Sequence, residues 1–228
     1  MRVVIMGGTS GIGLATARAL RADGAEVVVT GRDQERLAAA AAEGLTAERV
    51  DGTDEKAVTA FFERFGAFEH LVLAFSSGHV GLGPVRQIGL DAVRAAFEGK
   101  LFGYLLAVQR AQVTGSVTLV SAASARAGLP GSVGLAAVNG AIERIVSPLA
   151  ADLAPVRVNA VSPGVIDTGW WSFLPPEQRA AQFDAAAQSV PSGRVGTAED
   201  VAGAIRYVIG ADYVTGSILP VDGGFTVA

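Results

Sequence analysis

Gly7, Gly11 and Gly13 follow an apolar run near the start of the chain, and their spacing suits the binding of phosphate. Glycine permits a tight turn, a close approach of the backbone to a pyrophosphate and close packing of a helix on a strand. A helix that begins near Ile12 would direct its free amide groups and the positive end of its dipole at the phosphates. The sequence therefore predicts a dinucleotide-binding turn, with contacts expected from Gly7, Thr9, Ser10, Gly11, Ile12 and Gly13.

Apolar runs that suit strands alternate with stretches that suit helices along the whole chain. This alternation predicts a parallel sheet with right-handed crossovers and helices on both faces. We therefore expect one doubly wound α/β domain of the Rossmann type over residues 1–228, with a seven-stranded parallel sheet. The expected strands are 2–6, 26–30, 47–50, 70–75, 116–121, 156–161 and 217–221, and the expected helices are 12–22, 33–43, 54–65, 90–112, 132–152 and 198–210.

The composition narrows the class of protein. Half of the residues are hydrophobic and 18% are charged, which is typical of a globular chain and not of a disordered one. A net charge of -4 without a basic cluster argues against nucleic acid as a partner, and no apolar run reaches the ~20 residues of a membrane span. With no cysteine and two histidines we expect no metal site. These exclusions leave a cytoplasmic enzyme or binding protein, with a small molecule as its partner.

Residues 163–196 interrupt the alternation, because they carry four prolines and several glycines. We interpret residues 165–196 as an irregular substrate lid, called the lid below, beside the carboxyl ends of the strands. Trp170 and Trp171 lie in this segment and predict an apolar or aromatic substrate pocket. Packing within the lid or across a subunit interface is the alternative explanation for these aromatic residues.

Three further segments resemble the classical short-chain dehydrogenases/reductases. Residues 51–54 (DGTD) stand where that family has an aspartate that contacts adenine, and residues 157–168 (RVNAVSPGVIDT) are similar to its nicotinamide-side segment. Thr215-Gly216 and residues 221–224 (VDGG) resemble its C-terminal signature. The chain is identified as a member of this family over nearly its whole length. The resemblance implies further cofactor contacts from Asp51, Gly164, Ile166 and Thr168.

The end of the second expected strand bears on the choice of cofactor. Members that select NAD(H) usually carry an acid there, which bonds the ribose 2′-hydroxyl, whereas this chain has Gly31. Glycine leaves room for a 2′-phosphate, and the guanidinium of Arg32 can pair with it. We expect Asp33 to cap the following helix instead. NADP(H) is therefore favoured over NAD(H).

The resemblance implies a catalytic tetrad of Asn, Ser, Tyr and Lys, but this chain departs from all four. Ala122 stands in place of the serine, Leu135 in place of the tyrosine and Asn139 in place of the lysine. In the preceding helix, Lys100 stands in place of the asparagine. The usual proton relay is therefore in doubt.

Two interpretations follow. In the first, an oxidoreductase has rebuilt its relay around Lys100, because a desolvated lysine can have a pKa near neutrality. Asn139 would then bond the nicotinamide ribose, and Ser121 would orient the substrate unless strand alternation turns it away, with Ser76 or Ser77 as other donors. In the second, the protein binds the dinucleotide without turnover, as a sensor or a partner-binding module. A separate, simpler explanation of Lys100 is a charge on a helix surface.

For the first interpretation we expect hydride transfer to or from a small apolar or aromatic carbonyl, alcohol or imine. A cationic iminium would need no proton from an acid, which suits the missing tyrosine. Helices 90–112 and 132–152 are apolar on more than one face, and the corresponding helices pair between subunits in the family. We therefore expect a homodimer or a homotetramer.

Overall fold

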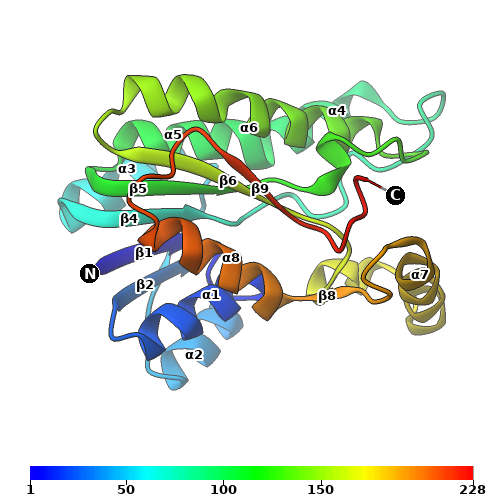
Figure 1. Cartoon of the computed structure of the whole chain (residues 1–228). Coiled ribbons are helices and arrows are strands. Elements are labelled where there is room, and N and C mark those ends of the chain that lie inside the picture. The colour runs from blue at the N-terminus through cyan, green and yellow to red at the C-terminus, as the bar shows by residue number, and fades with distance from the viewer. Residues whose placement is uncertain (228) are drawn as a thin grey trace.

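A computed structural model describes residues 1–227 and contains a seven-stranded sheet in the order β3-β2-β1-β4-β5-β6-β9 (Figure 1). Every neighbouring pair of these strands is parallel, which confirms the doubly wound α/β prediction. The order reverses between β1 and β4, which leaves a crevice at the carboxyl ends of those two strands. The strands are β1 (Arg2–Met6), β2 (Glu26–Gly31), β3 (Thr46–Arg49), β4 (Phe68–Leu73), β5 (Val113–Val120), β6 (Arg157–Pro163) and β9 (Ile218–Val221).

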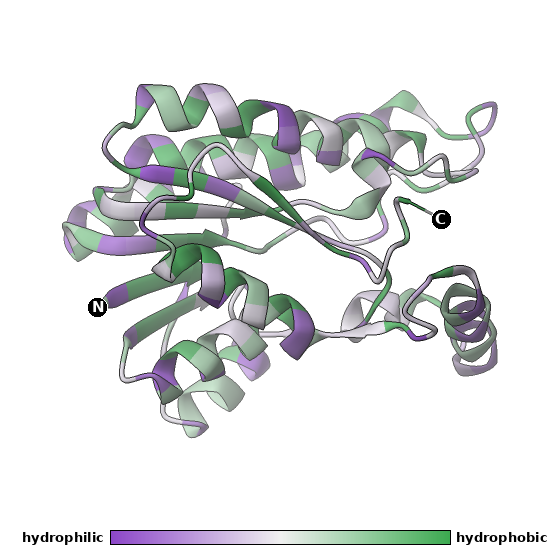
Figure 2. Cartoon of the chain, in the orientation of Figure 1, coloured by the Kyte–Doolittle hydropathy of each residue, from purple (hydrophilic) through white to green (hydrophobic). Residues whose placement is uncertain are grey.

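Helices cover both faces of the sheet and enclose one hydrophobic core on each side (Figure 1). One layer contains α3 (Glu55–Phe65), α4 (Leu90–Ala96), α5 (Gly103–Arg110) and α6 (Val133–Asp152). The other contains α1 (Gly11–Ala22), α2 (Gln34–Ala42) and α8 (Ala198–Gly210). The central strands are mostly hydrophobic, as Figure 2 shows, because both of their faces are covered.

β1 illustrates how the sequence produces this arrangement. Val3 and Ile5 belong to the core beneath α1 and α8, whereas Val4 and Met6 belong to the core beneath α3 to α6. Side chains alternate between the faces of a strand, so an unbroken apolar run is required where both faces are buried. The chain leaves β1 directly into the glycine turn, which therefore lies at the crevice between β1 and β4.

The expected helix 90–112 is not a single α-helix. α4 runs into the π-helix η1 (Phe97–Phe102), which continues into α5, and β5 begins at Val113. The apolar pattern of a π-turn differs little from that of an α-helix, so the sequence pattern did not reveal it. Single π-turns inside helices are frequent at functional sites, and this one carries Lys100.

The lid is more regular than expected. It contains the 3-10 helix η3 (Gly169–Phe173) and the helix α7 (Pro176–Ser189), and a parallel pair of short strands, β7 (Ile166–Asp167) and β8 (Gly196–Thr197), closes its base. Pro176 is the first residue of α7, a position where proline is favourable because its missing amide would have no partner within the helix. The prediction of an irregular segment is wrong here, because Pro176 begins a helix and does not interrupt one. In Figure 1, α7 stands apart from the two helix layers.

The segment that resembles the nicotinamide-side motif begins with two structural residues. Arg157 donates to the carbonyl oxygen of Val208 at the end of α8, at 2.8 Å. The Asn159 amide donates to the carbonyl of Val214 at 2.8 Å and accepts from the amide of Ser217 at 3.1 Å. These bonds fix the connection from α8 to β9, so this half of the motif supports the sheet and the other half faces the site.

α6 is long and apolar enough to cross a membrane, by length and composition alone. Polar residues such as Asn139, Glu143 and Arg144 interrupt it, so it is not an unbroken apolar run of that length. A helix that packs on the sheet of a globular protein passes the same test, and Val138, Ile142 and Val146 of α6 are buried in the core with β4, β5 and β6.

Candidate active site

The glycine turn has the backbone geometry that its residue types predict. Gly7 and Gly11 have φ values of +83° and +50°, which favour glycine. A Cβ atom at Gly13 would overlap the carbonyl oxygen of Gly7, so α1 packs too closely on the turn for any side chain. Ser10 precedes α1 and makes no side-chain cap hydrogen bond. The turn therefore forms a cradle, and first-turn amides of α1 point out of it without a capping side chain.

The nicotinamide-side segment lies against this cradle. Thr168 approaches within 3.5 Å of the place where a Cβ of Gly11 would stand, and its hydroxyl accepts from the amide of Trp170. Gly164 packs closely on Asp222, since a Cβ atom at Gly164 would lie 2.7 Å from the Cα atom of Asp222. Ile166 is buried, and its carbonyl accepts from the indole of Trp171. The structure thus brings Gly11 of the turn and Thr168 of the nicotinamide-side segment together.

Arginines gather at the end of β2. The exposed guanidinium of Arg32 lies 3.9 Å from the carboxylate of Asp51. Arg36, in the first turn of α2, donates to the hydroxyl of Ser10 at 3.4 Å. The sequence analysis missed Arg36, although its position four residues after Arg32 was the available signal. Asp33 accepts from two amides of the first turn of α2, which confirms its expected role as a cap.

The space beside Gly31 differs from the expectation. A Cβ at Gly31 would stand 2.7 Å from the hydroxyl oxygen of Thr9, so the Thr9 side chain fills the position next to the strand end. Thr9 is itself buried. The room that the sequence analysis expected beside Gly31 is therefore taken by the Thr9 side chain.

Lys100 is buried, with 8% of its surface exposed, so the interpretation of a helix-surface charge is wrong. Its Nζ donates to Oδ1 of Asn139 at 2.6 Å and to the carbonyl of Ser121 at 3.3 Å. Burial lowers the pKa of Lys100 from 10.5 to about 7, against a smaller opposing effect of the charge of Glu143. The amine can therefore gain or lose a proton near neutral pH.

The orientation of Asn139 fixes the geometry of this amine. Its Nδ2 donates to the carbonyl of Leu135 at 2.9 Å and to the hydroxyl of Ser124 at 3.2 Å. A carbonyl only accepts, so Oδ1 must face Lys100, and Lys100 must be the donor in that bond. Two of the three N–H groups of the ammonium are thereby engaged. The third is the one whose proton is lost when the amine becomes neutral. Both amide hydrogens of Asn139 are engaged, which leaves little capacity for the ribose contact expected of it.

Ser121 directs its hydroxyl to a carboxylate. Its Oγ donates to Oε1 of Glu143 on α6 at 2.9 Å, and Ser162 in β6 donates to the same oxygen at 2.7 Å. The expectation that Ser121 orients a substrate carbonyl is therefore wrong, because its one proton is engaged. Of the alternative donors, Ser77 donates to the carbonyl of Ala95, whereas Ser76 accepts from the amide of Gly78 and keeps its own proton.

The missing tyrosine has no substitute in Tyr104 of α5. The Tyr104 hydroxyl donates to the carbonyl of Val120 at 3.2 Å, and the side chain is buried in the core. Burial raises the pKa of Tyr104 well above 10, so this phenol keeps its proton. Leu135, at the usual position of the tyrosine, packs against the same core.

The aromatic residues of the lid pack mainly on one another. The Trp170 and Trp171 rings lie 4.8 Å apart, and Trp171 contacts Phe183 of α7 with ring centroids 5.7 Å apart. Trp171 also donates to the carbonyl of Ile166 at 2.9 Å. His79, from the loop after β4, stacks on Phe173 of the lid at 4.4 Å. Packing within the lid therefore accounts for Trp171, and the same cluster lies against the loop that follows β4.

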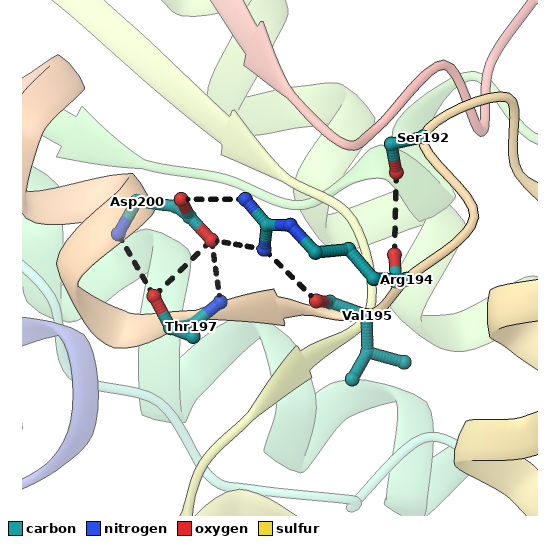
Figure 3. Close-up of polar contacts among 5 residues, drawn as sticks. All are labelled: Ser192, Arg194, Val195, Thr197 and Asp200. Atoms are coloured by element: carbon teal, nitrogen blue, oxygen red, sulfur yellow. Dashed lines mark hydrogen bonds and ion pairs between the residues drawn. The ribbon is translucent and has the colours of Figure 1, made fainter.

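The lid is anchored where it returns to α8. Arg194 donates to both carboxylate oxygens of Asp200 at 2.6 and 2.9 Å, and Asp200 accepts from the amide of Thr197, which caps the helix (Figure 3). The Arg194 guanidinium holds the pKa of Asp200 well below its usual range. A cavity of about 330 Å³ lies beside this anchor and is lined by lid residues and residues 220–224.

Known proteins match this chain over almost its full length. The family described as enoyl-(acyl carrier protein) reductase matches residues 7–226. The 3-oxoacyl-[acyl-carrier-protein] reductase MabA of Mycobacterium tuberculosis is 32% identical over 97% of this chain and 91% of its own length. Cis-4-hydroxycyclohexanecarboxylate dehydrogenase of Sinomonas cyclohexanicum is 33% identical over 98% and 95%.

Two further similarities bear on length and structure. The chain spans 42% of the length of an uncharacterized short-chain type dehydrogenase/reductase, y4vI, of Sinorhizobium fredii, to which it is 33% identical. A crystal structure of a small-chain dehydrogenase in complex with NADPH is 32% identical, with a TM-score of 0.88 over 100% of this chain and 99% of the other.

The buried amine predicts a pH-dependent stability. Between the folded pKa of about 7 and the ordinary value of 10.5, the unfolded chain holds a proton on Lys100 that the folded chain does not. The free energy of unfolding of the wild type should therefore rise with pH across this window, relative to Lys100→Met, by about 5 kcal/mol. Urea denaturation at several pH values measures the difference. Lys56→Met, at an exposed lysine of α3, is the control, and equal effects of both variants would contradict the prediction.

Proposed function

The chain belongs to the short-chain dehydrogenase/reductase family, and we propose that it is an NADP(H)-dependent oxidoreductase whose proton relay is built on Lys100. The observation that carries the proposal is the placement of this amine. The amine is buried, and it donates hydrogen bonds to the Asn139 side chain and to the Ser121 carbonyl. The residues at the usual serine and tyrosine positions, Ala122 and Leu135, cannot supply a proton.

The dinucleotide fits the residues that are present. Its phosphates suit the glycine cradle and the uncapped first turn of α1, and its bound nicotinamide supplies or accepts a hydride. Arg32 and Arg36, with no acid at the end of β2, favour a 2′-phosphate and therefore NADP(H). The residues proposed to hold the cofactor are Gly7, Thr9, Ser10, Gly11, Ile12, Gly13, Arg32, Arg36, Asp51, Gly164, Ile166 and Thr168.

Lys100 can act in either direction of the reaction. In reduction, the ammonium donates a proton to the substrate oxygen as that oxygen gains negative charge, and in oxidation the neutral amine removes it. A pKa of about 7 leaves both forms populated near neutrality. Asn139 keeps the amine in one orientation, whichever form is present, because its oxygen accepts from both. Alignment of hydride and carbonyl supplies the remainder of the acceleration.

The proposed substrate is a small apolar or aromatic carbonyl, its alcohol, or an imine. The aromatic cluster of Trp170 and its neighbours supplies an apolar surface in the lid. We also propose that the protein is a homodimer or a homotetramer. Leu90, Phe102 and Val133 expose 71%, 48% and 51% of their surface on the layer formed by α4, η1 and α6, which a second copy would cover.

Cofactor choice is tested by titrating the protein with NADPH and with NADH and following nicotinamide fluorescence. NADPH should bind at least ~10-fold more tightly than NADH, because charge-assisted hydrogen bonds to the 2′-phosphate contribute ~1.5–3 kcal/mol. Arg32→Ala should remove most of that difference. Arg94→Ala, at an exposed arginine of α4, is the matched control. Equal affinities in the wild type would contradict the preference, and binding of neither dinucleotide would contradict the whole proposal.

The role of Lys100 is tested by turnover. A panel of carbonyl compounds and imines should include at least one that oxidises NADPH in the presence of the protein, and Lys100→Met should slow carbonyl reduction by ~10²–10⁴-fold. Lys56→Met is the control, and affinity for NADPH should be unchanged in both variants. Tight NADPH binding with no turnover of any compound would favour a non-catalytic dinucleotide-binding protein. Full activity of Lys100→Met would show that the proton comes from elsewhere.

A further inference from the structure

A second buried charge lies close to Lys100 and has no part in the proton transfer itself. Glu143 is on α6, one turn beyond Asn139, and only 8% of its surface is exposed. A buried glutamate is rare unless it is paired and hydrogen-bonded, because removing a carboxylate from water is costly. The sequence analysis did not single out this residue.

The partners of Glu143 come from three elements. Oε1 accepts from Ser121, directly after β5, and from Ser162 in β6, while Oε2 lies 3.2 Å from Nε of Arg126. Arg126 follows the 3-10 helix η2 (Ala123–Ala125) and is 36% exposed. The carboxylate therefore ties α6 to the carboxyl ends of two neighbouring strands, beside the site of Lys100.

Ser121 joins this cluster to the amine. Its hydroxyl donates to Glu143, and its carbonyl accepts from Nζ of Lys100. A shift of the carboxylate would thus move one of the two acceptors that hold the amine. Asn139, which supplies the other acceptor, is on the same helix as Glu143, one turn away.

The charges around Lys100 are few. Glu143 of α6 acts on it through its charge, and Tyr104 of α5 has its ring 6.0 Å from Nζ and keeps its proton. Arg126 offsets part of the charge of Glu143 and also interacts with Asp222 of the C-terminal segment. On η1 itself, Glu98 is exposed to solvent, where water screens its charge.

We propose that Glu143 is a positioning residue, which holds the amine of Lys100 through Ser121 and, together with Arg126, sets how readily that amine is protonated. The inference rests on the proposed function for its catalytic meaning, but not for its test. A negative charge favours the ammonium form, and the guanidinium of Arg126 weakens that effect by neutralising the carboxylate. Removing the two charges must therefore have opposite consequences for Lys100, which a purely structural role would not produce.

The chain offers a direct test, because Lys56 and Lys100 are its only lysines. Protein labelled with ¹³C at lysine Cε gives two side-chain NMR signals, and Lys56→Arg shows which belongs to Lys100. The Lys100 signal is followed as a function of pH in the full-length wild type, Glu143→Gln and Arg126→Gln. Glu98→Gln, which removes an exposed carboxylate from η1, is the matched control.

The midpoint of the Lys100 titration should fall by about one pH unit in Glu143→Gln and rise in Arg126→Gln, with no change in Glu98→Gln. The Glu143→Gln variant would keep a side-chain oxygen that both serines can bond, so the fold should persist, and circular dichroism checks it. If Glu143→Gln does not fold, the sign of the Arg126→Gln shift decides alone. Unchanged midpoints, or shifts of both variants in one direction, would overturn the inference.

The outcome is separable from that of the proposed function, since the titration needs neither cofactor nor turnover. Opposite shifts of the midpoint combined with full activity of Lys100→Met would support the role of Glu143 in setting the charge while rejecting Lys100 as the acid. Unchanged midpoints combined with an inactive Lys100→Met would support Lys100 as the acid and reject the role of Glu143 in setting its charge. The pair of measurements therefore assigns a failure to one proposal or the other.

Discussion

The burial of one amine is the constraint on which the rest of this site depends. An ammonium group removed from water costs several kcal/mol unless polar groups surround it. The two hydrogen bonds of Lys100 go to neutral acceptors, an amide oxygen and a main-chain carbonyl, which can accept from both the charged and the uncharged amine. The carboxylate of Glu143, whose charge acts on Lys100, is itself engaged by two serines and an arginine. The balance between burial and this carboxylate places the titration of Lys100 near neutrality.

The fold supplies these partners because parallel strands end at one edge of the sheet. Ser121 after β5 and Ser162 in β6 come from neighbouring strands and reach the same oxygen of α6. The π-helix η1 brings the lysine to that edge from one side. The glycine turn and Thr168 lie together at the same edge, so the dinucleotide cradle and the amine share one cleft in the proposed mechanism. The fold is that of the family, whereas the polar residues at this edge of the sheet differ from the family's catalytic tetrad.

The strands of the sheet and the glycine turn were predicted well from the sequence, because both depend on local patterns. Buried strands such as β1 require unbroken apolar runs, and a helix packed against a turn requires Gly13, so both leave clear signals. The helix α7 escaped prediction because Ala186 is its one buried residue, so its sequence carries little apolar periodicity. The cluster around Glu143 escaped because it joins residues 121, 143 and 162, whose proximity depends on strand order and not on spacing. The sequence also did not show that the Thr9 side chain fills the space beside Gly31, because this contact joins residues that are distant along the chain.

The central claim is that Lys100 delivers the proton that accompanies hydride transfer, and the pH dependence of a single turnover tests it most directly. NADPH-loaded protein is mixed with a reducible carbonyl compound, and the loss of nicotinamide absorbance gives the rate constant from acid to alkaline pH. If Lys100 is the acid, the rate should be constant below a pH of about 7 and fall roughly tenfold per pH unit above it, because only the ammonium donates. A rate constant that does not change across neutrality would show that Lys100 does not deliver the proton.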